Sequence, residues 1–256
     1  NVFFFLFDVK MSWLEAFECT RYNFYMDAVK ENTSNKDDKQ PPPMRLPQWL
    51  KQNKTKSKAT KKLSQWLEKE VPNSICQEAR CPNRGECFAK GVLTFMILGT
   101  VCTRNCSFCS VRHGRPMPPD LSELQKILHA ITKLSLRFVV LTSPNRDDLP
   151  DGGAWHYANI VTSIHEQHPT VKVEVLIPDF QGKTDDLDIV IAGRPDVINH
   201  NIETVPSLYR SVRKGSLYGR SLDVLSYIKE KSPKTLTKTG IMLGLGETLE
   251  EIETTI

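Results

Sequence analysis

From residue 91 onward, short apolar runs alternate regularly with helix-like segments, and this alternation constrains the fold more than any other feature. The runs are LTFMILG (93–99), RFVVLTS (137–143), VKVEVLIP (171–178), DVINHN (196–201) and TLTKTGIMLG (235–244). Helix-like segments lie near 121–135, 154–168, 184–192, 204–213 and 220–231, and a last one starts near Glu247. Apolar runs separated by helices indicate a parallel sheet with covered faces.

Two α/β architectures fit this pattern: a (β/α) barrel, partial or full, and a doubly wound open sheet. A dinucleotide-binding open sheet would place G-x-G-x-x-G directly after its first strand. Here cysteines follow the first run, and the close glycine pair, Gly244 and Gly246, follows the fifth. We therefore predict a partial TIM-like barrel that is incomplete at its C-terminal end. In barrels the active site forms at the carboxyl ends of the strands.

Six of the seven cysteines fall into two triplets within a short stretch of the chain. The triplets are Cys76-x4-Cys81-x5-Cys87 and Cys102-x3-Cys106-x2-Cys109. A [4Fe–4S] cluster normally takes four protein thiolates. Three thiolates leave one iron open, and an open position is typical of catalytic metal sites. Two incomplete sets therefore predict two clusters that carry out chemistry.

Zinc and disulfides are the alternative uses of these cysteines. Zinc ribbons use paired C-x2-C knuckles and close four ligands, whereas the second triplet has one such pair and one extra cysteine. The odd count and the length of 256 residues argue against a disulfide scaffold. Cys19 stands apart from both triplets, and we interpret it as an ordinary thiol.

Composition excludes some classes of protein. A hydrophobic fraction of 39% and a charged fraction of 25% are those of a soluble globular protein. A net charge of +4 is too mild to argue for nucleic acid. The apolar start NVFFFLF is far shorter than the about 20 residues of a membrane helix, and no signal peptide is visible. We expect a cytoplasmic protein with no nucleic-acid or membrane partner.

The second triplet, placed at the first strand end of a βα barrel, resembles the radical S-adenosylmethionine (SAM) superfamily. The segments ICQEARCPNRGECF, TSPNRDDLPDGGA, VEVLIPDFQG, PDVINHNIETVPSLY and GIMLGLGETLEE resemble the lipoyl synthase family over residues 71–256. The resemblance implies two [4Fe–4S] clusters and SAM. Cys102, Cys106 and Cys109 would hold the cluster that binds SAM. Cys76, Cys81 and Cys87 would hold an auxiliary cluster that donates sulfur.

The activity implied by the resemblance is that of a sulfurtransferase. It inserts sulfur at C6 and C8 of an octanoyl chain that is amide-linked to a lipoyl carrier domain. The carrier would be a 2-oxoacid dehydrogenase E2 or the glycine cleavage H protein, and ferredoxin or flavodoxin would supply electrons. An aliphatic C–H carries no acidic proton, so acid–base side chains cannot activate it. A radical generated by a cofactor is the remaining route.

Several residues near the predicted strand ends are candidates for binding SAM or substrate. Phe108 would form an aromatic wall beside the cluster. Asn201 and Glu203 would contact SAM or substrate, or, with Thr204, would cap the next helix. Arg220 would meet a ribose or carboxylate, or form a surface ion pair.

Glycines and aspartates at other strand ends permit two interpretations each. Gly244 and Gly246, with Glu247, would form a backbone shelf on the adenine side, or a plain turn. Asp147 and Asp148 suit a turn, with a role at the barrel mouth as the lesser alternative. The six histidines show no ligand spacing and are interpreted as packing or surface residues.

Three regions follow from these observations. Residues 1–62 are expected to be a poorly ordered extension, because residues 31–62 are polar, Pro-rich and then Lys-rich. The lysines form a solvated arm or, alternatively, dock an acidic partner. Residues 63–90 carry the auxiliary cluster, and residues 91–256 form the barrel.

The lipoyl synthase family continues beyond the GLGET segment, with a sixth strand and an Arg-Ser-Ser-Tyr motif whose serine ligates the auxiliary cluster. We therefore expect this chain to be a fragment. Its fifth strand would have an unpaired edge, and its auxiliary cluster would lack a fourth protein ligand. Two other classes stay open at this point: a methylthiotransferase with two clusters, and a non-enzymatic iron–sulfur or zinc protein.

Overall fold

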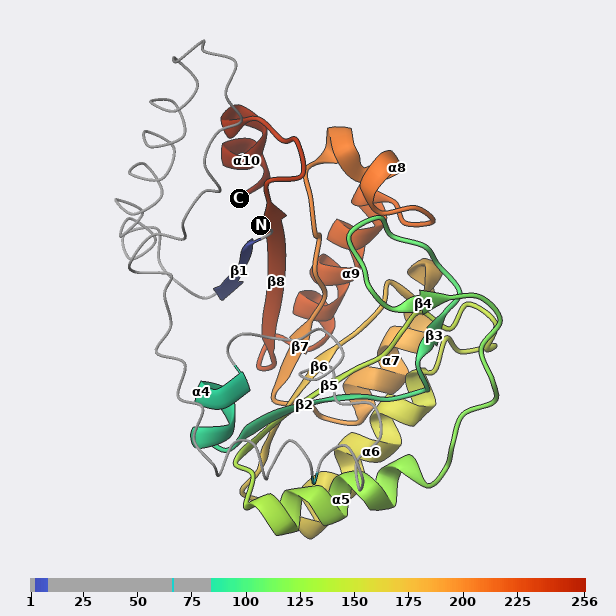
Figure 1. Ribbon diagram of the computed structural model, residues 1–256, viewed down its shortest axis with the longest axis vertical. Helices are drawn as coiled ribbons and strands as arrows, with labels where there is room; N and C mark the ends of the chain where they lie inside the picture. The colour runs from blue at the N-terminus through green and yellow to red at the C-terminus, as the bar shows by residue number, and fades with distance from the viewer. Residues whose placement is uncertain (1–2, 9–65, 67–83) are drawn as a thin grey trace, which may run out of the picture. The chain divides into compact units, whose positions relative to one another are not determined.

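Five parallel strands and one antiparallel strand form the main sheet of the computed structural model, which describes residues 3–8, 66 and 84–256 (Figure 1). The parallel strands are β2 (Val92–Met96), β5 (Phe138–Thr142), β6 (Lys172–Leu176), β7 (Val197–Asn199) and β8 (Leu236–Leu243). Each overlaps one of the five apolar runs, so the prediction of a parallel sheet is confirmed.

The strand order identifies the barrel rather than the open sheet. The parallel strands lie side by side in the order β2-β5-β6-β7-β8, which is also their order in the chain. A doubly wound sheet reverses its order at a switch point, and no reversal occurs among these strands. No ladder joins β2 to the opposite edge within the described residues, so the barrel is partial.

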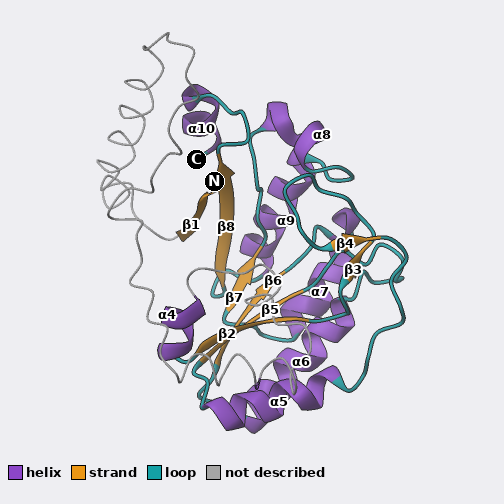
Figure 2. Ribbon diagram, viewed as in Figure 1, coloured by secondary structure: helices purple, strands orange, loops and turns teal. Residues whose placement is uncertain are grey.

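Four helices connect consecutive strands and form one layer. They are α5 (Glu123–Leu134), α6 (Ala154–Gln167), α7 (Thr184–Ala192) and α9 (Tyr218–Lys231). α5 contacts α6, α6 contacts α7, and α7 contacts α9. Figure 2 shows these helices together along one side of the sheet. This is the arrangement expected when successive βα units all turn in the same direction.

The core lies between this helix layer and one face of the sheet. Alternate strand residues point to the same face, and Leu93, Val139, Leu141, Val173 and Val175 are all fully buried on the helix side. The helices meet them with one apolar stripe each, which includes Ile127 and Ile131 of α5 and Tyr157, Ile160 and Ile164 of α6. Burying each such side chain contributes about 1.5–3 kcal/mol.

The opposite face of the sheet is partly polar. Glu174 of β6 alternates with Val173 and Val175 and therefore points away from the helices. Its carboxylate accepts hydrogen bonds from Lys238 Nζ of β8 at 2.9 and 3.0 Å and from Asn199 Nδ2 of β7 at 3.1 Å. Three neighbouring strands thus place one polar cluster on the inner face of the partial barrel.

The last parallel strand does not have the unpaired edge that we expected. β1 (Phe3–Asp8) pairs antiparallel with β8, from Phe3 opposite Leu243 to Asp8 opposite Lys238. The prediction is wrong because the apolar, phenylalanine-rich N-terminal run suits a strand and supplies a partner for β8. Of the extension expected over residues 1–62, all but residues 3–8 lie outside the described residues, so that expectation stays a prediction.

Proline substitutions in β1 test this pairing. Successive N–H groups of an antiparallel strand point alternately toward and away from the partner, and proline has none. Of Phe5→Pro and Leu6→Pro, one therefore breaks the ladder to β8 and the other is its matched control. We expect only the ladder-breaking variant to expose the β8 edge and self-associate more strongly, as measured by size-exclusion chromatography with light scattering. Two variants that behave like the parent would contradict the pairing.

The remaining elements are short. They are α4 (Arg84–Ala89), β3 (Val101–Cys102), β4 (Arg112–His113), η2 (Phe180–Gly182), η3 (Pro206–Leu208), α8 (Tyr209–Val212) and α10 (Leu249–Thr255). None of the helices in the described ranges has the length and apolar character needed to cross a membrane.

Candidate cluster and cofactor site

The second cysteine triplet lies on the loop that follows β2, at the carboxyl edge of the sheet. Cys102 belongs to β3 and is buried, Cys106 is half-buried, and Cys109 is exposed. β3 pairs in parallel with β4, and the Gly114 N–H donates to the Cys102 carbonyl at 2.9 Å. The Ser107 N–H donates to the carbonyl of Val212 at 2.9 Å. These bonds hold residues 101–114, here called the cysteine loop.

The sulfur of Cys102 is surrounded by backbone donors. The N–H groups of Arg104 and Asn145 both lie 3.3 Å from Cys102 Sγ. N–H groups aimed at a sulfur also form hydrogen bonds to metal-bound thiolates. The polypeptide around Cys102 therefore suits a metal-bound sulfur.

The other two thiols sit in surroundings that oppose free thiolates. Burial raises the pKa of Cys106 to about 11, with Arg213 opposing and the neighbouring cysteines adding to the rise. The atoms around the Cys109 sulfur exclude part of its water and also raise its pKa, although the residue as a whole is exposed. Grouped thiols of this kind are neutral at pH 7 unless a metal displaces their protons, so metal binding here would release protons.

Within the described ranges, no three His, Cys, Asp or Glu side chains converge as the ligands of a single metal ion would. A cube presents separate iron corners to separate sulfurs, so its thiolates stand further apart than the ligands of one ion. The spacing of the three cysteines in the sequence remains the argument for a cluster over a zinc ion.

Unsatisfied polar atoms gather at the carboxyl edge of the sheet. Asn145 follows β5, and Asn199, Asn201, Glu203 and Thr204 end or follow β7. Each of these residues has a buried side-chain oxygen with no hydrogen-bond partner. Buried polar atoms are normally paired, and an orphaned set at one edge indicates a polar ligand. The site therefore fits a polar cofactor such as SAM.

Asn201 and Glu203 do not cap a helix. The next helical turn, η3, begins at Pro206 with Val205 at its N-cap position, and the hydroxyl of Thr204 has no partner. Instead the Glu203 N–H donates to the carbonyl of Gly240 at 3.0 Å, which ties this segment to β8. The capping alternative is wrong, and contact of Asn201 and Glu203 with SAM or substrate stays a prediction.

Glu203 is held in an unusual environment. Its backbone adopts a left-handed φ of 67°, which costs energy for a residue other than glycine and often marks a functional site. Burial raises the pKa of its carboxyl group, while Arg213 and a hydrogen bond from Asn201 oppose the rise. A carboxyl group in this state can donate or accept a hydrogen bond toward a ligand.

The predicted roles of Arg220, Asp147 and Asp148 resolve into ion pairs. Arg220 Nη1 lies 3.3 Å from Asp179 Oδ2, and the side chain of Arg220 is 25% exposed, so this pair is partly buried. Asp147 pairs with Arg104 at 2.7 Å, and Asp148 with Arg146 at 2.9 Å. Asp147 therefore joins its loop to the cysteine loop, whereas Asp148 pairs within its own loop, as the expected local turn allows.

Gly244 and Gly246 form a turn at the end of β8. Their φ angles of 95° and 119° lie in the region that favours glycine. Glu247 accepts hydrogen bonds from the N–H groups of Gly244 and Leu245. The turn is therefore observed, with the Gly244 N–H already used, and an adenine shelf on these glycines stays a prediction.

Two positively charged residues at this edge were not predicted from the sequence. Arg104 is buried inside the cysteine loop, and Arg213 is buried beside it, with Nη1 3.0 Å from Ser221 Oγ. Within the described residues, Arg213 contacts no carboxylate at ion-pair distance and lies 5.6 Å over the ring of Tyr209. Arg104 was detectable from its place between Cys102 and Cys106, whereas nothing in the sequence marked Arg213.

The first triplet is only partly within the described residues. Cys87 lies in α4 and is half-buried, whereas Cys76, Cys81 and the Lys-rich arm lie outside the described residues. Phe108 is half-buried in the cysteine loop. His156 and His200 are buried packing residues, as expected. His200 hydrogen-bonds to Ile177 and Ser221, and burial lowers its pKa to about 4.

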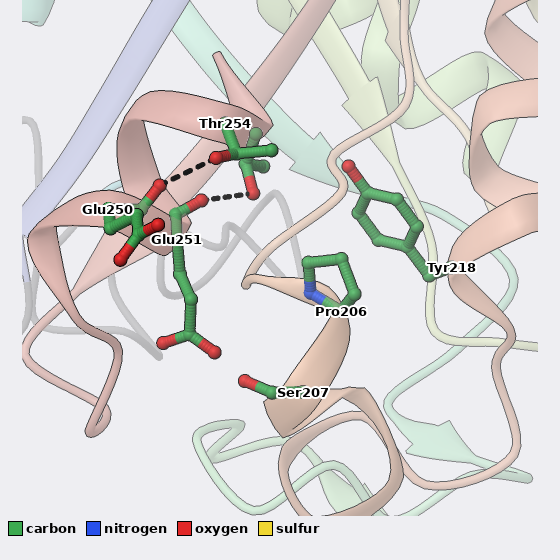
Figure 3. Close-up of a pocket in the computed structure, with 7 residues that line it drawn as sticks. Pro206, Ser207, Tyr218, Glu250, Glu251 and Thr254 are labelled. Carbon is green, nitrogen blue, oxygen red and sulfur yellow. Dashed lines mark hydrogen bonds between the residues drawn. The ribbon is translucent and has the colours of Figure 1, made fainter.

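A separate pocket of about 510 Å³ lies beside α10. Figure 3 shows Pro206, Ser207 and Tyr218 facing Glu250 and Glu251 across it. Thr254 and Thr255 also line the pocket, and their hydroxyls donate to backbone carbonyls of α10. None of the predicted site residues lines this pocket.

Comparison with known proteins first shows the superfamily to which the chain belongs. The radical SAM superfamily matches residues 96–256, which include the cysteine loop and all strands after β2. The chain belongs to this superfamily. A crystal structure of methylornithine synthase overlaps 55% of this chain and 42% of its own, with a TM-score of 0.42 and 14% identity, and carries no weight in the assignment.

The sequence relatives narrow the class. A lipoyl synthase from Methylobacillus flagellatus is 46% identical over 231 residues, which are 88% of this chain and 71% of that protein. Lipoyl synthases from Methylococcus capsulatus and Escherichia fergusonii are 47% and 49% identical over 82% of this chain and 66% of their own length. The chain belongs to the lipoyl synthase family and spans about two thirds of the length of these relatives.

Proposed function

We propose that this chain carries the SAM-cleaving and sulfur-inserting site of a lipoyl synthase. The substrate is an octanoyl chain on a lipoyl carrier domain, and sulfur enters at C6 and C8. The observation that carries the proposal is the cysteine loop beside the orphaned polar atoms of Asn145, Asn201 and Glu203. Soft sulfur ligands and hard polar groups at one sheet edge suit a cluster and SAM together.

In this proposal, different residues hold the cluster and bind SAM. Cys102, Cys106 and Cys109 hold one [4Fe–4S] cluster, with Phe108 beside it. Asn201 and Glu203 bind and orient SAM, and Arg220 contributes the donors that Asp179 leaves unused. When bound, the cluster and SAM supply a radical able to take hydrogen from an unactivated carbon.

A second cluster on Cys76, Cys81 and Cys87 is the proposed source of sulfur. Its fourth protein ligand in the family is a serine of the Arg-Ser-Ser-Tyr motif. The proposed carriers are a 2-oxoacid dehydrogenase E2 domain and the glycine cleavage H protein, and ferredoxin or flavodoxin is the proposed electron donor. We also propose a cytoplasmic location.

Anaerobic reconstitution tests the proposal. Two cubes would give about eight irons per chain and one cube about four. After reduction, we expect SAM to be converted to 5′-deoxyadenosine and an octanoylated H-protein peptide to gain two sulfur atoms, both followed by mass spectrometry. A lysine-acetylated peptide is the matched control and should gain none. A loaded and reduced chain that leaves SAM intact would overturn the assignment.

A further inference from the structure

Arg104 lies inside the cysteine loop, and its side chain joins that loop to three others. Nε and Nη2 donate to Asp147 at 2.7 and 2.9 Å, in the loop after β5. Nη1 and Nη2 donate to Asp179 at 3.0 and 2.7 Å, in the loop after β6. Nη1 also donates to Ser216 Oγ at 2.9 Å, just before α9. One guanidinium thus serves both carboxylates in bidentate fashion.

The burial of this group makes the contacts strong. The side chains of Arg104 and Asp179 are 5% and 0% exposed, and that of Asp147 is 27% exposed. Charge-assisted, bidentate hydrogen bonds are the strong ones, and the planar fork of arginine fits them as lysine cannot. Around Arg104 the loop has little core packing of its own, because Asn105, Ser107 and Cys109 are exposed.

We infer that Arg104 is a positioning residue that fastens the cysteine loop over the carboxyl edge of the sheet and so sets how the loop's cluster meets SAM. The Arg104 N–H also lies 3.3 Å from Cys102 Sγ, so the fastened residue touches a ligand sulfur directly. The link to SAM rests on the proposed function. The fastening itself requires no cofactor.

Proteolysis of the cluster-free protein tests the fastening. Chymotrypsin cleaves after aromatic residues, and Phe108 lies within the loop. We expect at least about tenfold faster cleavage after Phe108 in Arg104→Met/Asp179→Asn, because the loop opens locally more often. Arg104→Lys keeps the positive charge but loses the planar guanidinium that makes two parallel hydrogen bonds. Its rate of cleavage after Phe108 should lie between the rates of this variant and the parent. Cleavage after the buried Tyr157 reports global unfolding and should rise far less.

Arg146→Lys is the matched control, because Arg146 is also buried and joins the Leu98 and Met117 carbonyls to Asp148 without touching residues 102–109. It should leave cleavage after Phe108 unchanged. Equal cleavage after Phe108 in the parent and both Arg104 variants would overturn the inference.

A second measurement tests the consequence for SAM. In the reconstituted parent, SAM should change the electron paramagnetic resonance spectrum of the reduced cluster. We expect the Arg104 variants to keep the parent's iron content but to need about tenfold more SAM for the same change. An unchanged midpoint, or loss of the iron itself, would overturn the positioning role. Absence of any SAM-dependent change in the parent would instead count against the proposed function.

Discussion

Replacing Cys102, Cys106 and Cys109 together by serine is expected to remove about four irons per chain and to abolish SAM cleavage. The three thiols sit on one loop, and a [4Fe–4S] cluster needs its thiolates. The remaining iron should belong to the other triplet. Iron and sulfide analysis after anaerobic reconstitution, together with an assay for 5′-deoxyadenosine, measures both effects.

The reciprocal variant, with Cys76, Cys81 and Cys87 replaced by serine, is the natural comparison. It should also lose about four irons but retain SAM cleavage, and it should form no sulfur-containing product. Cys19→Ser, which lies outside both triplets, should change neither quantity. Equal loss of SAM cleavage in both triple variants would contradict the division of labour between the triplets.

Removal of the Asp179 carboxylate is expected to cost about 3 kcal/mol of the free energy of unfolding, because it leaves buried arginine charge less well compensated. Asp179 is fully buried between Arg104 and Arg220. Urea unfolding of Asp179→Ala at pH 7 measures the loss. A variant as stable as the parent would show that these ion pairs do not stabilise the fold.

The same carboxylate predicts a pH dependence. Burial acts to raise the pKa of Asp179, but the hydrogen bonds and charge of Arg104 outweigh it and lower the pKa from 3.8 to about 2. Because the folded pKa is depressed, this stability is present above about pH 4 and is lost as the pH falls through about 2. The parent should therefore lose more stability than Asp179→Ala over this range.

Asp120 offers a matched control. Hydrogen bonds from Ser122 and Lys126 lower its pKa to about 2 as well, but it is exposed to solvent. Exposed ion pairs contribute little to stability. Asp120→Ala should therefore unfold at nearly the same urea concentration as the parent at pH 7, in contrast to Asp179→Ala.

Local sequence patterns predicted most of the fold because each parallel strand coincides with a short apolar run. Runs such as RFVVLTS are rich in β-branched residues, and the helices between them carry one apolar stripe. The chain order of the strands then followed from short connections. β1 was missed because an apolar run at a chain end has no local signal for its partner, which lies 230 to 240 positions away in β8.

The sequence predicted only those parts of the site whose residues lie close together in the chain. The spacing of Cys102, Cys106 and Cys109 placed the cysteine loop correctly, since all three lie in one segment. The capping role for Thr204 was wrong because the preceding residue is held by a carbonyl of β8, a contact that no local pattern encodes. Arg104 was missed as an anchor for the same reason, because its partner Asp179 lies 75 positions away.

The long reach of the Arg104 contacts also bears on the order of events during maturation. The groups that fasten the cysteine loop lie 43, 75 and 112 positions along the chain. Contacts of such sequence separation close late. The loop therefore gains its final shape only after synthesis has passed Ser216 and the sheet has assembled. We expect iron–sulfur carriers to deliver their cargo to the folded chain, in contrast to small zinc domains, in which the metal itself drives folding.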